Sequence, residues 1–125
     1  MKRETFYRCE ECGKMVMVVV DGEGELVCCG KPMVVAEPNI DGAPEKHLPD
    51  CNLEGDVLSV NIGEVDHPMI DVHYIPWIYV VTEDGVLGKC LQPGDAPHAE
   101  FVLGGKKPLA VFEYCTVHGL WRVDL

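Results

Sequence analysis

Apolar residues in this chain fall into short runs that glycines and prolines separate. Six runs are rich in the branched and aromatic side chains that favour strands, and they lie at 15–20, 33–36, 57–62, 75–81, 101–103 and 109–114. Typical turn pairs occur between the runs: Asp21-Gly22, Asp84-Gly85 and Gly104-Gly105. Helical periodicity is scarce. Short, regularly spaced strands with such turns predict an all-β sandwich or barrel.

The pattern predicts two domains that meet near Glu37-Pro38-Asn39, just after the fourth cysteine and a short apolar run. A small cysteine-rich unit is expected at 1–36 and a β-sandwich at 37–125. About 90 residues can bury a hydrophobic core, but a unit of about 35 needs a disulfide, a metal or a partner to be stable. The cysteines of the first unit are therefore the first candidates for chemistry.

The charge of the chain limits its partners. The formal net charge is −11, with a balance of −1 over residues 1–36 and −10 over residues 37–125. Such a surface repels phosphate backbones and anionic lipids, so neither nucleic acid nor a membrane is an expected partner. An anionic substrate would need a locally positive site.

No secretory or membrane-spanning segment is expected from the sequence. Glu4 follows Met1-Lys2-Arg3 at once, and the six apolar residues at 15–20 are far short of the roughly 20 that cross a bilayer. The cytoplasm is the expected location. In a reducing compartment, the seven cysteines are expected to be metal ligands or free thiols rather than disulfides.

Four cysteines of the first unit have the spacing of a metal site. Cys9 and Cys12 form a C-x-x-C pair, and Cys28-Cys29 follows after fifteen residues. Four thiolates so placed predict a tetrahedral site for zinc or for a single iron, and a structural zinc ribbon is the commonest outcome. Adjacent ligands such as Cys28-Cys29 are unusual and predict a tight backbone turn. Spacing alone does not separate iron from zinc.

The second domain carries scattered histidines and one C-x-x-H pair. The pair is Cys115 and His118, and the other candidate ligands are His47, His67 and His73. Each of these histidines alone is more often a surface or core residue than a ligand. Together, four imidazoles and one thiolate would form a five-coordinate site with one open position, suited to iron, zinc or copper.

Six segments, in order and over nearly the whole chain, resemble the desulfoferrodoxin family: 9–30, 45–49, 67–69, 77–78, 92–97 and 113–121. The resemblance implies a desulforedoxin-like metal ribbon followed by an immunoglobulin-like β-sandwich, with two non-haem irons. By this resemblance, the first iron is held by Cys9, Cys12, Cys28 and Cys29. The second is held by His47, His67, His73 and His118 in a plane, with Cys115 beneath it.

The same resemblance implies superoxide reductase activity, in which superoxide is reduced by one electron to hydrogen peroxide. Rubredoxin or a similar small protein is the implied electron donor, a homodimer the implied assembly, and detoxification of reactive oxygen the implied role. Lys46 is expected to attract superoxide and to orient a water that donates a proton. Glu45 is expected to occupy the open position of the iron after oxidation.

Three alternatives stay open at this point: a zinc-ribbon binding module, a pure electron carrier and a superoxide dismutase. The remaining candidates are interpreted more simply. His98 is expected to be a solvated loop residue, and Cys51 and Cys90 are expected to be free thiols. Trp77 and Trp121 are expected in the core, and each is also a candidate wall of the iron site.

Overall fold

Strands make up nearly all the regular structure in residues 5–39 and 44–125, which the computed structural model describes except for the side chain of Glu45. Within these ranges the single helix, α1 (Pro44–His47), is four residues long. No helix of this described part is long and apolar enough to cross a membrane. The chain folds as two units, Met1–Glu37 and Pro38–Leu125. The expectation of an all-β protein is confirmed.

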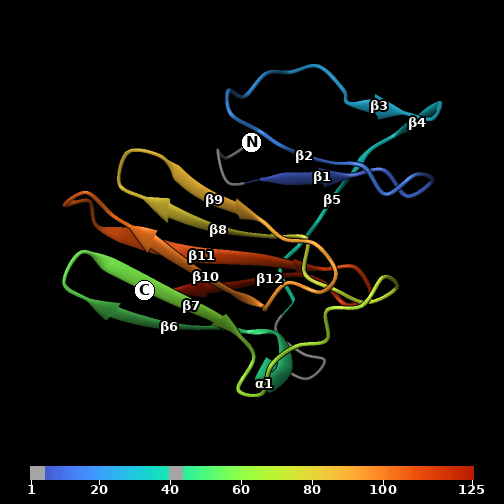
Figure 1. Cartoon of the computed structure of the whole chain (residues 1–125). Coiled ribbons are helices and arrows are strands. Elements are labelled where there is room, and N and C mark those ends of the chain that lie inside the picture. Colours follow the sequence, from blue (N-terminus) through green and yellow to red (C-terminus); the bar gives the residue numbers. More distant parts are fainter. Residues whose placement is uncertain (1–4, 40–43) are drawn as a thin grey trace. The chain divides into compact units, whose positions relative to one another are not determined.

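The first unit is a small ribbon of five short strands (Figure 1). β1 (Phe6–Arg8) pairs antiparallel with β2 (Met15–Met17) on one side and with β5 (Val34–Val35) on the other. A separate hairpin joins β3 (Val27–Cys28) to β4 (Lys31–Pro32). Among its described residues only Phe6 and Cys9 are buried apolar side chains, so the ribbon has almost no hydrophobic core.

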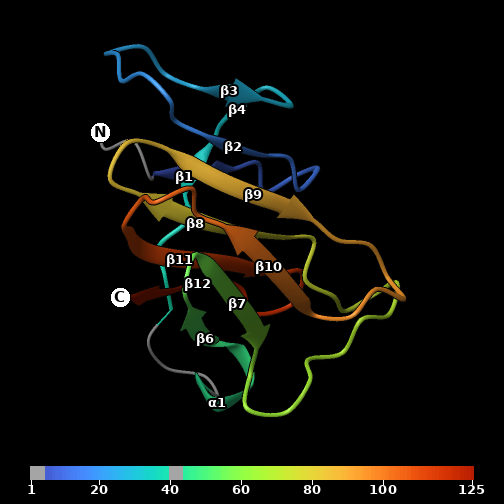
Figure 2. The ribbon, with the colours of Figure 1, turned by 60° about the vertical axis from the view of Figure 1, so that its left-hand side comes forward.

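The second unit is a sandwich of two antiparallel sheets (Figures 1 and 2). One sheet has the order β10-β7-β6, from β6 (Pro49–Glu54), β7 (Val57–Ile62) and β10 (His98–Val102). The other has the order β12-β11-β8-β9, from β8 (Trp77–Thr82), β9 (Val86–Cys90), β11 (Pro108–Cys115) and β12 (Gly119–Asp124). Three strands facing four is the immunoglobulin-like arrangement that we expected.

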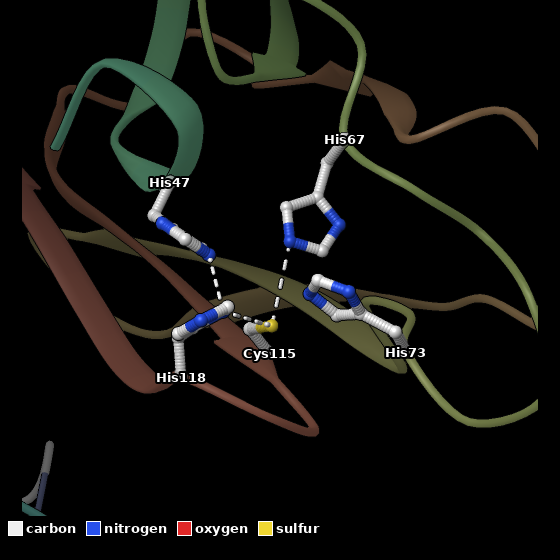
Figure 3. A group of neighbouring side chains, drawn as sticks. All are labelled: His47, His67, His73, Cys115 and His118. Carbon is white, nitrogen blue, oxygen red and sulfur yellow. Dashed lines mark hydrogen bonds between the residues drawn. The ribbon is translucent and has the colours of Figure 1, made fainter. Parts of the chain in front are cut away.

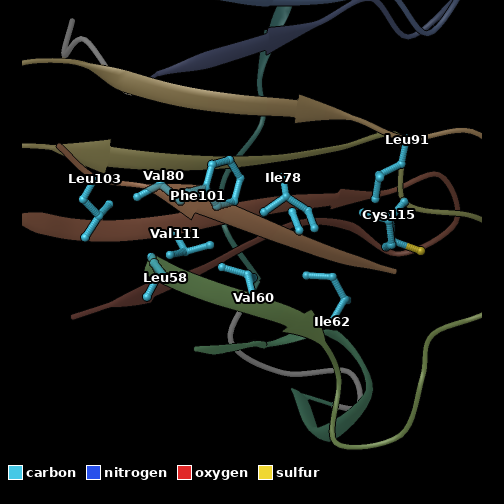
Figure 4. Packing of buried hydrophobic residues seen from close by; sticks show 12 residues of the cluster. Leu58, Val60, Ile62, Ile78, Val80, Leu91, Phe101, Leu103, Val111 and Cys115 are labelled. Carbon is cyan, nitrogen blue, oxygen red and sulfur yellow. The ribbon is translucent and has the colours of Figure 1, made fainter. Parts of the chain in front are cut away.

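The core fills the space between these two sheets (Figure 4). Along β7, buried residues alternate with half-buried ones, so Leu58, Val60 and Ile62 all point inward. They belong to one cluster with Ile78 of β8 and Val111 of β11. Each such side chain contributes about 1.5–3 kcal/mol to stability when fully buried. Cys115, at the end of β11, belongs to the same cluster, so one prospective metal ligand is part of the core.

The observed strands differ from the predicted ones where polarity hides the pattern. The run 57–62 forms β7 as expected, but only 15–17 of the run 15–20 is strand, and Val19 and Val20 are exposed. The ribbon strands β1, β3 and β4 were not predicted. In the sandwich, β6, β9 and β12 were not predicted either. They lie at sheet edges, where one face and one side of each strand meet water, so polar residues interrupt their apolar positions.

Gly63 fixes the approach between α1 and the segment that follows β7. Its φ is +83°, and a Cβ there would lie 2.5 Å from the backbone oxygen of Lys46 and 2.7 Å from that of Val65. Gly55, at the opposite end of β7, also has a positive φ, +60°, but a Cβ there would meet nothing within 4 Å. A side chain at Gly55 would therefore add backbone strain alone, whereas a side chain at Gly63 would add both backbone strain and a steric clash.

We predict that Gly55→Ala lowers the free energy of unfolding by about 1–2 kcal/mol, the cost of a left-handed backbone. Gly63→Ala should lower it by about 2–5 kcal/mol, because the clash with α1 adds to the same strain. Chemical denaturation of the metal-loaded variants measures both values. Equal losses at the two positions would contradict the close approach of α1.

Candidate metal centres

The first group of metal donors consists of the four cysteines of the ribbon. Cys9 and Cys12 lie in the turn after β1, Cys28 ends β3, and Cys29 lies in the turn that leads to β4. All four Sγ atoms lie within 4.8 Å of one another. The Sγ of Cys12 is 3.7 Å from that of Cys28, which is 4.0 Å from that of Cys29. The ribbon therefore brings the four expected thiols to one centre.

Two backbone turns aim these thiols. In the first, the N–H of Cys9 donates to the carbonyl of Lys14 and the N–H of Gly13 donates to the carbonyl of Cys9, which closes the C-x-x-C loop. In the second, Cys29 has a φ of +54° and is the only described residue other than glycine with a positive φ. This left-handed conformation costs roughly 1–2 kcal/mol. It forms the tight turn that the adjacent pair Cys28-Cys29 predicts.

Protonation of the four thiols shows why they need a cation. The backbone N–H of Cys12 lowers the pKa of Cys9 to about 7. Hydrogen bonds of the Cys28 thiol to the sulfurs of Cys9 and Cys12 are the largest causes that raise the pKa of Cys28 to about 12, and burial raises it further. Only a bound cation makes four thiolates at one centre favourable, and four sulfurs are the donor set of zinc and of a single iron.

The second group of donors collects at one end of the sandwich, from three segments far apart in the sequence. His47 is the last residue of α1, and His67 and His73 lie between β7 and β8. Cys115 ends β11, and His118 lies in the turn before β12. One donor atom from each residue lies within 4.8 Å of all the others. All five residues expected at the second site are thus together.

The four imidazoles form a closed ring around the sulfur of Cys115 (Figure 3). Successive ring centroids are separated by 5.0 Å from His47 to His67, 4.7 Å to His73, 5.2 Å to His118 and 4.6 Å back to His47. The Sγ of Cys115 lies 3.4 Å from Nε2 of His67 and 3.7 Å from Nδ1 of His118. Four nitrogens around one sulfur are the donor arrangement that the sequence predicts.

Burial favours the neutral form of two of these imidazoles, and a hydrogen bond sets the tautomer of one of them. His67 Nδ1 donates to the carbonyl of Pro68 at 2.8 Å, which leaves Nε2 as the acceptor on the side of the sulfur. Burial lowers the pKa of His67 to about 4. Burial, with His118 as a smaller cause, also lowers the pKa of His73. Neutral imidazoles have the free lone pairs that a metal ion requires.

Two buried groups at this site would gain from a bound metal ion. His73 Nε2 is buried and has no hydrogen-bond partner among the described residues. The thiol of Cys115 is fully buried, and burial raises its pKa. A metal ion would satisfy both atoms, because it would bind the imidazole nitrogen and stabilise the thiolate. The donors present therefore fit an iron ion, and imidazole with one thiolate is a suitable donor set for it.

Asn39 and Trp121 hold this site in place, and sequence reasoning assigned a role at the site only to Trp121, as a candidate wall. Asn39 Nδ2 donates to the carbonyls of His118 at 2.7 Å and Leu120 at 3.2 Å. Trp121 stacks on His47 with ring centroids 4.8 Å apart and an interplanar angle of 9°. Glu113 is fully buried on β11, where burial raises the pKa of its carboxyl well above the ordinary value. An isolated Asn carries no sequence signal of such a role.

A pocket of about 270 Å³ opens onto the imidazoles. Its lining includes Lys46, whose side chain is exposed beside buried His47. The side chain of Glu45 lies outside the described residues, so its predicted role stays a prediction. Of the two tryptophans, Trp121 walls the site, whereas Trp77 packs with Tyr79 and Tyr114.

The other candidates lie apart from both donor groups. Cys51 on β6 and Cys90 on β9 are free thiols, as expected. His98 begins β10 and is half-buried, so the expectation of a solvated loop residue was wrong. Its Nδ1 lies 2.7 Å from Oδ1 of Asn61, a partner from a different strand that the sequence does not reveal.

Related proteins share both units. A relative named desulfoferrodoxin from Syntrophotalea carbinolica is 47% identical over 94% of this chain and 94% of that protein. Another from Nitratidesulfovibrio vulgaris is 44% identical over 94% of each. The crystal structure of the superoxide reductase from Treponema pallidum matches 99% of this chain and 100% of that one, with a TM-score of 0.82 and 29% identity.

Two family descriptions match the chain in the order of its units. The sequence model described as "Desulfoferrodoxin, N-terminal domain" matches residues 2–35, and the one described as "Desulfoferrodoxin" matches residues 39–124. The four-cysteine group and the four-histidine, one-cysteine group, which are the two metal sites of this family, are both present here. With an all-β fold, both donor groups and relatives that cover nearly its whole length, this chain belongs to the desulfoferrodoxin family.

Proposed function

We propose that this chain reduces superoxide to hydrogen peroxide at the four-histidine, one-cysteine site, using electrons from rubredoxin or a similar small redox protein. The observation that carries the proposal is the ring of four imidazoles around Cys115, at the floor of an open pocket. The relatives' names support the substrate, since structures with the same fold are superoxide reductases. The biological role that we infer is detoxification of reactive oxygen.

The chemistry of the proposed reaction needs one electron and two protons for each superoxide. A ferrous ion bound by His47, His67, His73, His118 and Cys115 would supply the electron, and with four neutral imidazoles and one thiolate the site would carry a formal charge of +1. Burial favours the neutral form of His67 and His73, which this formal charge assumes. The side chain of His118 is exposed, so protons can come from water at the mouth of the pocket.

Cys115 is the residue that distinguishes this site from an all-nitrogen one. Backbone N–H groups of His118 and Val117 act against burial and lower the pKa of its thiol. Such N–H groups stabilise the thiolate and moderate its donation of electron density. We propose that the Cys115 thiolate would donate electron density to an iron bound here.

Lys46 and Glu45 precede His47 in α1 and are proposed to act in different states of the site. Lys46, exposed at the pocket, attracts the anionic substrate and orients a water that donates a proton. Glu45 is proposed to bind the oxidised site, where the formal charge has risen by one. The position of α1, fixed at Gly63, brings this segment to the pocket.

Several further features are proposed on indirect grounds. The family resemblance supports a homodimer. Seven free cysteines support a reducing compartment, and hence the cytoplasm. The cysteines of the ribbon are proposed to hold an iron that replaces the missing hydrophobic core.

The nearest competing activity is superoxide dismutation. A reductase forms one hydrogen peroxide for each superoxide, consumes one electron from an external donor and releases no oxygen. A dismutase releases oxygen and consumes no donor. Measuring hydrogen peroxide, oxygen and oxidised rubredoxin in the same reaction tests the proposal, and oxygen release without donor oxidation would contradict it. Metal analysis tests the zinc-ribbon alternative, which requires a single zinc.

We predict that Cys12→Ser loses one of two irons and destabilises the ribbon, because the small unit depends on its metal. The second iron and much of the superoxide reaction should survive, since its proposed ligands all lie in the sandwich. Iron content, the visible spectrum and the rate of superoxide reduction measure these effects. Full loss of activity with the second iron still bound would instead make the first centre an obligatory electron relay.

Cys115→Ser is predicted to remove the sulfur-to-iron charge-transfer absorption of the oxidised protein and to lower the rate of superoxide reduction by at least about tenfold. Cys51→Ser and Cys90→Ser are matched controls, because both thiols lie outside the two donor groups and both irons should remain. An unchanged spectrum and rate in Cys115→Ser would show that this thiol is no ligand.

Substitutions of the two residues before His47 should have different effects on the reaction. Lys46→Ala is predicted to slow the encounter of reduced protein with superoxide and to weaken its dependence on ionic strength, because salt screens the lost attraction. Glu45→Ala should leave the encounter unchanged or slightly faster and should alter the oxidised spectrum. Pulse-generated superoxide at several salt concentrations measures the encounter. Equal rates for wild type and Lys46→Ala at low salt would refute the attraction by Lys46.

A further inference from the structure

Two exposed side chains of opposite charge line the pocket above the imidazoles. Among the described residues they are Lys46 and Asp66. The proposed function explains Lys46, but an acid beside the path of an anionic substrate works against binding. Glu64 and Asp71 are also exposed in this segment, yet neither contributes to the described lining of the pocket. Asp66 is therefore the acid of this segment that needs an explanation.

The carboxylate of Asp66 is held by a residue of the sandwich. Nδ2 of Asn61 donates to Oδ1 of Asp66 at 3.0 Å. Asn61 lies on β7, the central strand of its sheet, where it pairs with Asp50 on one side and with His98 on the other. A strand paired on both sides is among the most rigid places in a fold. Asp66 is thus anchored to the frame of the sandwich rather than free in the loop.

His98 fixes the orientation of this amide. Its Nδ1 lies 2.7 Å from Oδ1 of Asn61. Because the amide nitrogen must face the carboxylate, the amide oxygen faces the imidazole, and Nδ1 of His98 must carry a proton to donate. Nε2 of His98 lies 3.6 Å from Oε1 of Glu100. The histidine outside the metal site is therefore the far end of a polar chain, His98 to Asn61 to Asp66, that ends at the pocket.

We propose that Asp66 is a specificity-determining residue of the superoxide site. Its negative charge, held at the pocket wall by Asn61 and His98, opposes the attraction by Lys46. Repulsion from one fixed charge grows in proportion to the charge of the anion, so a dianion is penalised twice as much in free energy as a monoanion. Asp66 thereby favours a small monoanion such as superoxide over sulfate or hydrogen phosphate. This inference rests on the proposed function, since it concerns the substrate of that site.

The test compares wild type with Asp66→Asn and with Asp71→Asn, a matched control that removes an exposed negative charge from the same segment but outside the described pocket lining. Azide binding to the oxidised iron protein, followed in the visible spectrum, probes a monoanion. The concentration of sulfate that displaces half the azide probes a dianion. Iron content checks that the site is filled in each variant.

At low ionic strength, Asp66→Asn is expected to tighten azide binding by about two- to threefold, the effect of one charge several ångströms away in water. Sulfate binding should tighten by about the square of that factor, or roughly fivefold. Asp71→Asn should change both by much less, and salt should abolish the differences. Equal effects of the two substitutions, or an equal gain for azide and sulfate, would overturn the charge role.

The nitrogen-15 shifts of the His98 ring test the polar chain without reference to activity. In the wild type they should report a proton on Nδ1, and in Asn61→Ala this preference should be lost. A wild-type ring with its proton on Nε2 would overturn the proposed anchoring of Asp66. Failure of the reduced wild type to react with superoxide would refute the proposed function instead, while the azide and sulfate comparison would still decide the role of Asp66.

Discussion

The second unit holds five metal-donor groups together at one end of the sandwich, an arrangement that is unfavourable without a metal ion. The rest of this unit serves to keep the five groups in place. Four imidazoles and a buried thiol lie with their donor atoms within 4.8 Å of one another. No pairing among them satisfies all five, as the orphaned Nε2 of His73 shows within the described chain. The free energy of folding must therefore bring the five donors together, and the free energy of binding a metal ion offsets the cost of that arrangement.

The two units bring their metal donors together in different ways. In the sandwich, a large core positions the donors: Cys115 belongs to the core cluster, Trp121 stacks on His47, and Asn39 holds the backbone at His118. In the ribbon the order is reversed, because almost no core exists and the donors themselves must organise the chain. The left-handed backbone at Cys29 is the strain that this arrangement contains.

Local patterns in the sequence were enough for the fold class and for the four-cysteine group, whereas the full second donor group came from the family resemblance. Tertiary pairing explains what the patterns missed. The alternation in 57–62 predicted β7, and C-x-x-C and C-x-x-H spacing predicted ligands, because these signals need only neighbouring residues. His98 was misread because its partner, Asn61, lies 37 residues away on another strand. Edge strands such as β6 were missed because half-solvated positions carry polar residues. The role of Asp66 depends on a pocket whose lining comes from several separate segments.

The central claim is that one chain binds two irons, one among four sulfurs and one among four imidazoles and a sulfur. Anomalous diffraction at the iron edge, from crystals of protein isolated with its native metals, tests it directly. The account predicts two iron peaks for each chain, one bounded by Cys9, Cys12, Cys28 and Cys29 and one inside the ring of imidazoles next to Cys115. A single peak in the ribbon, with the imidazole ring free of iron, would contradict the account.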